Sequence, residues 1–248
     1  MIQRAPDRGG GVVTTNVELL RVEIETLWTR DSRGRIKGPD LVLAVAADGW
    51  IAEIGSRVPD ALTAELEAIV ASTPPAPDPA APPPAVAECD ALLSRAFGAV
   101  ETTSGPTYVI PPTLTYPPTA PVECSDGANV ESLRDLNPGN WGVEEWDDLL
   151  GGLLGPWTMA TSDRRIIAIC HTPESSDQGA EAGVWTHPDF RGRGHAATVT
   201  AAWATLMGPT GKVLFYSTSR TNLSSQRVAD RLGLPLIGWL WQIASPDQ

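Results

Sequence analysis

Hydrophobic and polar positions divide the chain into two patterned halves. In residues 17–71, apolar positions alternate in NVELLRVEIETLW, an unbroken apolar run LVLAVA follows, and DALTAELEAIVA has helical spacing. This order predicts a strand, a second strand and a helix, with a turn at Arg33 and Gly34 that lets the two strands pair as a hairpin. A further helix is predicted over residues 86–97.

A proline-rich stretch separates the two halves. Residues 73–85 hold seven prolines in thirteen positions, which disfavours helix and central strand and favours polyproline II. The sequence TYVIPPTLTYPPTAPVE is predicted to be an edge strand or coil for the same reason. We therefore predict an amino-terminal α+β region over residues 1–72, a linker and extended segment over 73–125, and a second domain over 126–248.

The second domain has a denser pattern. One or two helices are predicted within residues 128–154, and strands at PWTMAT, RIIAICHT and EAGVWT follow. After them come a helix that opens in RGRGHA, a strand KVLFYST, a helix NLSSQRVADRL and a strand LPLIGWLWQI. Asn222 is the expected N-cap of the second of these helices, and Gly233 its end. The alternation of strands and helices predicts an α/β fold.

Composition narrows the class of protein. The 18 basic against 30 acidic residues give a formal net charge of -12, which disfavours nucleic-acid binding because that requires clustered Lys and Arg. Three widely spaced cysteines favour neither a disulfide framework nor a metal site. No signal peptide and no apolar run of membrane-spanning length is evident. We expect a cytoplasmic protein that binds no metal, membrane or nucleic acid.

The most informative stretch is EAGVWTHPDFRGRGHA, residues 181–196. A strand runs into a proline-containing turn, and Gly192 and Gly194 then open a helix. Successive backbone N–H groups and the positive end of the helix dipole would converge there, which predicts a phosphate or pyrophosphate site. The alternative is that the two glycines only shape the turn. A Walker loop and a Rossmann fingerprint are both incomplete in this stretch.

These residues resemble a known family. The segment 191–196, RGRGHA, is similar to the R/Q-x-x-G-x-G/A loop of the GNAT acetyltransferases, and Asn222-Leu223-Ser224-Ser225 is similar to their N-x-x-[AS] helix. The two motifs have the family's order and spacing, with a strand between them. The resemblance covers residues 128–242 and implies an α/β fold with a mixed central sheet of the GNAT type, whose fourth and fifth strands splay apart around acetyl-CoA.

The resemblance also implies the residues that would hold acetyl-CoA. Backbone groups of the strand would pair with the pantetheine arm, the glycine loop would hold the pyrophosphate, and the following helix would face the cosubstrate. The implied residues are Val184, Trp185, Thr186, Arg191, Gly192, Arg193, Gly194, His195, Ala196, Asn222 and Ser225.

Direct acetyl transfer to an amine requires a base and a proton for the departing thiolate. Glu181 is the first candidate for the base because it lies on the strand before the loop, close to where some family members carry a catalytic glutamate. The alternative is a solvated or ion-paired carboxylate. His171 is a second candidate for a base or relay. Many family members carry a tyrosine acid where this chain has Ala229, which leaves Ser225, Tyr216 or water.

The sequence indicates less about the amine that accepts the acetyl group than about the acetyl donor. Trp141 and Trp146 lie among acidic residues in a segment where the family recognises acceptors, and could hold a cationic amine. The alternative is a solvated helix face with Trp146 turned to the core. We predict an N-acetyltransferase that acts on a primary amine of a small molecule. Acetylation of a peptide amino terminus, a non-catalytic acyl-CoA-binding module and a homodimer stay open.

No chemistry is evident in the amino-terminal half. A degenerate copy of the same fold, a lid over the acceptor site and a dimerisation module are three alternatives among which the sequence does not choose.

Overall fold

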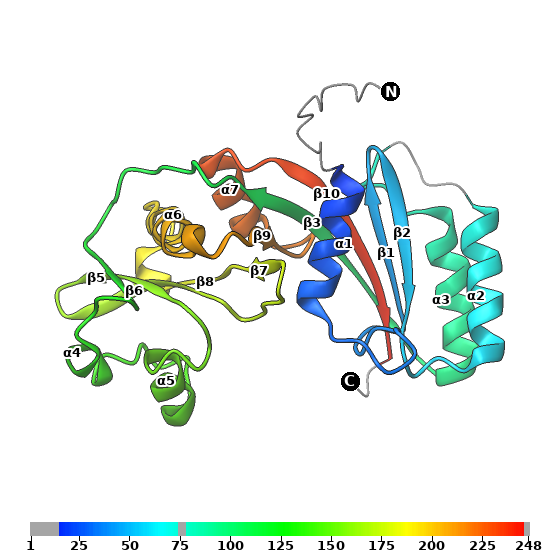
Figure 1. The fold of residues 1–248 in the computed structure, drawn as a ribbon, viewed down its shortest axis with the longest axis horizontal. Helices are drawn as coiled ribbons and strands as arrows, with labels where there is room; N and C mark the ends of the chain where they lie inside the picture. Colours follow the sequence, from blue (N-terminus) through cyan, green and yellow to red (C-terminus); the bar gives the residue numbers. More distant parts are fainter. Residues whose placement is uncertain (1–14, 74–77, 246–248) are drawn as a thin grey trace, which may run out of the picture.

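The computed structural model describes residues 15–73 and 78–245 as two sheets that diverge near the middle of the molecule (Figure 1). The helices are α1 (Asn16–Leu27), α2 (Asp60–Ser72), α3 (Pro84–Phe97), α4 (Val130–Arg134), α5 (Val143–Leu150), α6 (His195–Met207) and α7 (Leu223–Leu232). The strands are β1 (Leu41–Ala46), β2 (Gly49–Ile54), β3 (Glu101–Ile110), β4 (Val122–Cys124), β5 (Thr158–Ser162), β6 (Arg165–His171), β7 (Gly179–Glu181), β8 (Gly183–Thr186), β9 (Val213–Ser217) and β10 (Leu236–Ala244).

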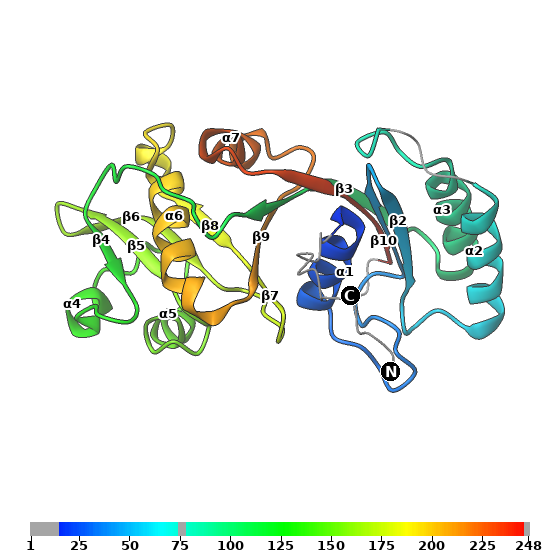
Figure 2. The same ribbon diagram turned by 45° about the horizontal axis from the view of Figure 1, so that its top comes forward.

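The larger sheet has six strands in the order β2-β1-β10-β3-β9-β7. Helices α2 and α3 cover one of its faces and α1 covers the other (Figure 2). Successive residues of β1 enter the two cores in turn: Leu41 packs under α2 and α3, whereas Val42 packs under α1. Burial on both faces explains why LVLAVA is an unbroken apolar run rather than an alternating one.

The smaller sheet has four strands in the order β4-β5-β6-β8. Helix α6 packs on one face, where Ala168 and Cys170 are buried, and α4 and α5 pack on the other, where Ile169 is buried. The strand pairs are antiparallel except for β7 with β9, which is parallel. The predicted α/β fold with a mixed sheet is therefore confirmed.

The two sheets separate between β7 and β8, which are consecutive in the chain. β7 pairs with β9, and the N–H of Ala182 still donates to Phe215 O at 3.0 Å. From Gly183 onward the chain pairs with β6 alone. β8 is consequently an edge strand, and its unpaired backbone groups face the gap toward β9. A splay between these strands is what the family resemblance led us to expect.

One predicted strand is a helix. Residues 16–27 form α1, not the first strand of a hairpin, because Leu20 and Ile24 lie one turn apart on a buried face. A capping box fixes its start: Thr15 Oγ1 accepts from the N–H of Glu18, and Glu18 Oε2 accepts from the N–H of Thr15. The hairpin of this region is instead β1 with β2, which turns at Asp48 and Gly49.

The proline-rich extended sequence is also placed differently from the prediction. Residues 107–110 of β3 lie inside the larger sheet, paired with β9 and flanked by β10, and are neither edge strand nor coil. The prolines permit this because Pro111 and the prolines after it follow the strand, and Pro106 precedes the residues paired with β9.

Strand pairing crosses both predicted domain boundaries. β3 comes from the segment predicted as a linker, and β10 closes the carboxy-terminal pattern yet pairs with β1. The division at 1–72, 73–125 and 126–248 stays a prediction about folding units, but the sheet does not follow it. Across the described ranges, every helix is too short or too polar to cross a bilayer.

Candidate functional site

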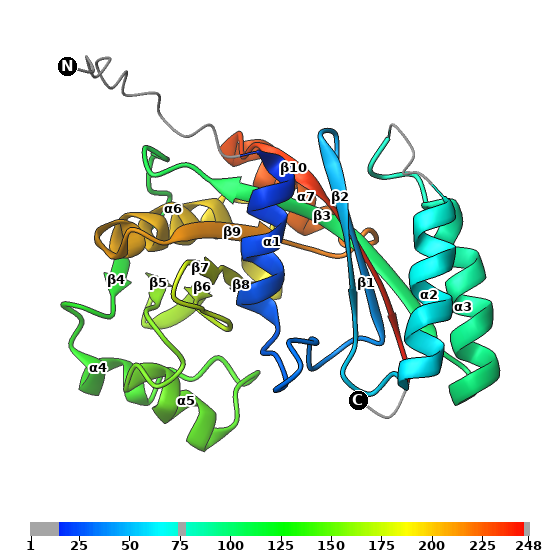
Figure 3. The same cartoon turned by 45° about the vertical axis from the view of Figure 1, so that its right-hand side comes forward.

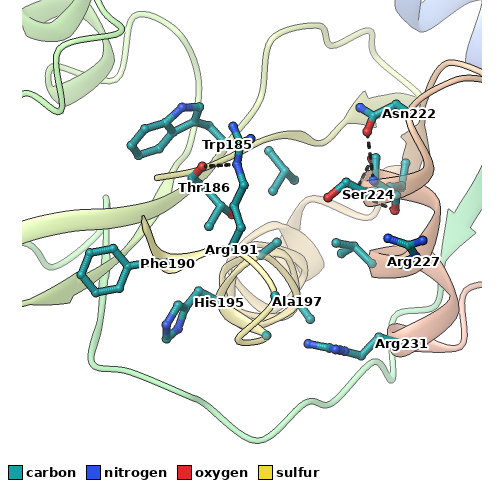
Figure 4. A pocket seen from close by; sticks show the side chains of 17 residues that line it. Trp185, Thr186, Phe190, Arg191, His195, Ala197, Asn222, Ser224, Arg227 and Arg231 are labelled. Carbon is teal, nitrogen blue, oxygen red and sulfur yellow. Dashed lines mark hydrogen bonds between the residues drawn. The ribbon is translucent and has the colours of Figure 1, made fainter. Parts of the chain in front are cut away.

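A cavity of about 620 Å³ lies in the gap between β8 and β9, between the amino-terminal end of α6 and helix α7. Figure 4 shows it with α6 seen end-on and α7 beside it. The lining residues come from β8, the loop before α6, α6, β9 and α7: Val184, Trp185, Thr186, Phe190, Arg191, Gly192, Gly194, His195, Ala196, Ala197, Tyr216, Asn222, Ser224, Ser225, Arg227, Val228 and Arg231. Ten of the eleven residues expected to hold acetyl-CoA are among them.

The glycine loop adopts the backbone that its sequence predicts. Gly192 and Gly194 both have left-handed backbones, with φ of 77° and 89°. A side chain at Gly194 would in addition lie 3.0 Å from Tyr116 Oη and 3.2 Å from Arg231 Nη1, whereas one at Gly192 would meet open space. Gly194 caps α6, whose first N–H groups have no partner within the helix and face the cavity. The loop thus offers main-chain donors that suit an anion.

Arginines supply the charge of the cavity. Arg191, Arg227 and Arg231 line it, and no acidic side chain does so among the residues that the structure describes. Figure 4 shows Arg227 and Arg231 extending from α7 toward α6, with Arg191 on the other side. Arg191 is held in place by a bond from its Nε to Thr186 O at 3.3 Å. In a chain with a net charge of -12, this local excess of positive charge favours an anionic ligand.

Two of the expected residues use their side chains to fix the cavity wall. Asn222 Oδ1 accepts from the N–H of Ser225 at 3.1 Å and so caps α7, as predicted. Ser225 Oγ lies 2.7 Å from the phenol oxygen of Tyr216, which comes from β9. Burial raises the pKa of Tyr216, so the phenol is protonated at neutral pH. Ala229, one turn after Ser225, is fully buried in the core.

Arg193 is the expected residue that does not line this cavity. It lies over the ring of Phe190 at 5.3 Å and lines a neighbouring space of about 610 Å³. His195 borders both spaces, and its Nδ1 lies 2.8 Å from Thr119 Oγ1. Burial, with a smaller effect of Arg193, lowers the pKa of His195, so the ring is neutral at neutral pH.

Glu181 is buried beside the splay and does not line the cavity. Its Oε1 accepts from Ser217 twice, from the N–H at 2.7 Å and from Oγ at 2.9 Å. Strand alternation turns it away from α6 and toward α1, where it meets the buried carboxyl group of Glu23. Burial raises the pKa of Glu181. The solvated or ion-paired carboxylate considered for this position is wrong.

His171 lies at the start of the splay, on the same face as Glu181. Its Nε2 would be 2.7 Å from a side-chain carbon added at Gly183, so it packs directly on the first residue of β8. Its ring meets Trp141 edge-on at 5.1 Å, and burial lowers its pKa. Trp146 is in the core and donates to Arg134 O at 3.0 Å, as the structural alternative for this residue expected.

Three residues of the site escaped the sequence analysis. Arg227 and Arg231 stand four residues apart on the helix after Asn222, and that spacing on a helix already assigned to the ligand was a usable signal. Glu23 carried no such signal, since nothing in the sequence links a carboxylate in the first described helix to a strand more than 150 residues later.

Comparison with known proteins finds one family model that matches the carboxy-terminal half. Residues 116–235 match the family model of the acetyltransferase (GNAT) domain. None of the curated proteins matches the chain.

Solved structures with similar folds include an acetyltransferase from the GNAT family of Colwellia psychrerythraea, with 16% identity, 65% of this chain and 63% of that one covered, and a TM-score of 0.45. A GCN5-related N-acetyltransferase-like protein from Streptococcus suis has 18% identity, 87% of each chain covered and a TM-score of 0.44. A tandem GNAT protein from the clavulanic acid biosynthesis pathway has 12% identity, 86% and 79% covered, and a TM-score of 0.47.

Proposed function

We propose, from the match of residues 116–235 to the acetyltransferase (GNAT) domain, that the chain transfers the acetyl group of acetyl-CoA directly to a primary amine of a small molecule. The observation that carries the proposal is the cationic cavity at the free edge of β8, closed at one end by the glycine loop and the start of α6.

Successive parts of the cavity suit the pyrophosphate, the pantetheine arm and the thioester of acetyl-CoA. The N–H groups of residues 191–196 and the three lining arginines suit a pyrophosphate. The unpaired edge of β8 at Val184, Trp185 and Thr186 suits the amide groups of the pantetheine arm. Tyr216 and Ser225 line the wall formed by β9 and α7, where the thioester would lie.

The transfer needs two proton movements. The amine nitrogen attacks the thioester carbon, its proton passes to Glu181 directly or through water, and the tetrahedral intermediate collapses as the C–S bond breaks. The thiolate takes a proton from Tyr216 through Ser225 or from water. Tyr216 supplies, from β9, the phenol that Ala229 does not provide. His171, neutral and beside Gly183, is the alternative base on the same face.

The elements packed beside Glu181 support a compact amine as the acceptor. Helix α1 packs across β7 next to Glu181, and Trp141 with His171 borders the start of β8. An extended peptide would need an open groove along this face. Peptide amino termini therefore form the second acceptor class to be screened, after polyamines, amino acids and aminoglycoside-like amines.

Calorimetric titration with acetyl-CoA and CoA tests the cavity first. Wild-type protein should bind both, and the double variant Arg227→Glu/Arg231→Glu should lose at least about 100-fold in affinity because two attractions become repulsions. Arg95→Glu on α3 makes one such Arg-to-Glu change outside the cavity and should bind normally. A folded wild-type protein that binds neither ligand contradicts the proposal.

A thiol-release assay with the acceptor panel follows. Turnover with a small amine supports the proposal, and turnover only with peptides supports the second acceptor class. Tight acetyl-CoA binding without turnover on any amine would instead favour an acyl-CoA-binding module.

A further inference from the structure

Helix α1 belongs to the amino-terminal half but packs on the strand that carries Glu181. Figure 3 shows α1 between β7 and β8 on one side and β1 and β2 on the other. The contact is close: a side chain at Gly179 would overlap Thr26 Oγ1 and approach Val22 Cγ1 to 3.3 Å. One turn of α1 therefore sits directly on β7, and this places Glu23 against Glu181.

The carboxyl groups of Glu23 and Glu181 can form a hydrogen bond to each other only if one of them is protonated. Glu23 is fully buried, and Glu181 is 6% exposed. Ser217 supplies two donors to Glu181 Oε1, but as carboxylates the two oxygens of Glu23 and Oε2 of Glu181 have no donor at all. Two buried adjacent carboxylates cannot both be charged without a large repulsion. One proton between them removes the repulsion and supplies the missing donor.

We propose that Glu23 is a positioning residue of the acetyl-transfer site: its carboxyl group holds one proton shared with Glu181, keeps Glu181 charged and fixes the orientation of its free oxygen. This rests on the proposed function. Because Ser217 donates two hydrogen bonds to Glu181, the negative charge is more stable on Glu181, and the proton is held by Glu23.

The electrostatics of the surroundings agree with this assignment. Burial and the charge of Glu181 raise the pKa of Glu23 well above its ordinary value. The Ser217 side chain opposes the rise at both groups, but only Glu181 is also stabilised by the backbone N–H of Ser217 and by Glu23. Tyr216 on β9 and Cys170 on β6 are the other titratable groups acting near the pair, and burial raises the pKa of each. Both are neutral at neutral pH, so neither adds a charge beside the pair.

The arrangement gives the amino-terminal half a chemical role. When Glu181 takes the proton of the attacking amine, both carboxyl groups are protonated and the pair is neutral. The second proton is later released to solvent. The proposal makes the site depend on α1, because a proton on Glu23 is the donor that Glu181 Oε2 otherwise lacks among the described residues.

Infrared spectroscopy tests the shared proton without any substrate. At pH 7 the wild-type protein should show the carbonyl stretching band of a buried protonated carboxylic acid. Glu23→Gln should abolish the band, since Glu181 stays charged beside the new amide donor. Glu25→Gln on the exposed side of the same helix should leave it unchanged. A wild-type protein with no such band, or a band that survives in Glu23→Gln, overturns the proposal.

The pH profile of kcat/KM tests the role in transfer, with acetyl-CoA and the best amine of the acceptor screen. An amide donates less strongly to a carboxylate than a carboxylic acid does, so in Glu23→Gln the acid limb should move to higher pH, and in Glu23→Leu it should move further. The acetyl-CoA affinity of both variants should stay within about twofold of wild type, which shows that the fold is kept. Superimposable profiles of wild type and Glu23→Gln overturn the proposal. A wild-type protein without transfer activity contradicts the proposed function, and the infrared result still decides the shared proton.

Discussion

The cavity between β8 and β9 and the acid pair behind it lie on opposite faces of one extended stretch of chain, residues 179–186. The cavity is wide and cationic, and most of its lining residues lie between positions 184 and 197, with Arg227 and Arg231 added from α7. The acid pair is almost fully buried, anionic, and made of two side chains separated by more than 150 residues, Glu23 and Glu181.

The two regions depend on different kinds of interaction. A main-chain anion site tolerates changes of side chain but requires a particular backbone conformation at Gly194. A buried acid pair tolerates almost no change in packing, because its repulsion must be balanced by a proton and by donors from Ser217. Changes that affect one region and leave the other intact therefore test whether ligand binding and proton transfer are separate tasks.

The largest effect is expected where the two halves of the chain meet. Gly179→Ala places a carbon over Thr26 Oγ1 and 3.0 Å from the ring of Phe215, so it should cost about 3 kcal/mol of unfolding free energy by overpacking. Urea denaturation measures the loss. Gly127→Ala, which meets open space, is the matched control. Adding Thr26→Ala to Gly179→Ala should restore part of the loss, and a double variant no more stable than Gly179→Ala alone would contradict the close contact.

The next effect separates the cavity from the acid pair. Gly194→Glu combines a left-handed backbone, contacts with Tyr116 and Arg231, and a negative charge at the anion site, so acetyl-CoA affinity should fall by about 100-fold or more. Calorimetry measures it. Gly152→Glu has a similar φ of 79° and open space far from the cavity, and it should bind normally. The infrared band of the acid pair should persist in both variants.

The elements that could be predicted from sequence are those whose signals are local. The helix over residues 195–207 and the helix that Asn222 caps were predicted because a glycine loop, an N-cap and a terminal glycine specify them directly. Residues 16–27 were assigned to a strand because Val22 and Ile24 fit an alternating pattern as well as a helical one, and packing against the sheet decided between them.

The residues of the candidate site also divide into those with a local sequence signal and those placed by long-range packing. The residues of the glycine loop line the cavity because one short motif fixes their backbone, with Arg193 turned aside by its contact with Phe190. Glu23 was out of reach, since its partner is set by how α1 packs on β7, a long-range contact that no local pattern encodes. The interior position of β3 has the same origin.

A third effect concerns stability and pH. Below about pH 4 both folded and unfolded chains hold the proton of Glu23, but above the ordinary pKa of Glu only the unfolded chain releases it. Each further pH unit then costs the folded state about 1.4 kcal/mol until the raised pKa of Glu23 is reached. Glu23→Gln should therefore raise the unfolding free energy by about 2 kcal/mol at pH 8 and hardly at all at pH 4.

Urea denaturation at the two pH values checks this stability effect. Glu25→Gln should change stability by less than about 0.5 kcal/mol at either pH because its side chain is exposed. An equal gain at both pH values for Glu23→Gln would show that packing, not the titration of a buried acid, explains the difference.

The smallest effect lies at the wall between the two regions, at Tyr216. Tyr216→Phe removes the phenol that lies 2.7 Å from Ser225 Oγ but keeps the ring in the core, so kcat should fall about tenfold while acetyl-CoA affinity is retained. Tyr108→Phe, on a buried neighbouring ring with its centroid 6.5 Å away, should keep full activity. A thiolate that leaves easily needs little help from an acid, so the loss in Tyr216→Phe should shrink with an acetyl thioester of a more acidic thiol. A loss that is the same for both donors would place Tyr216 in the packing of the wall and leave the proton to water.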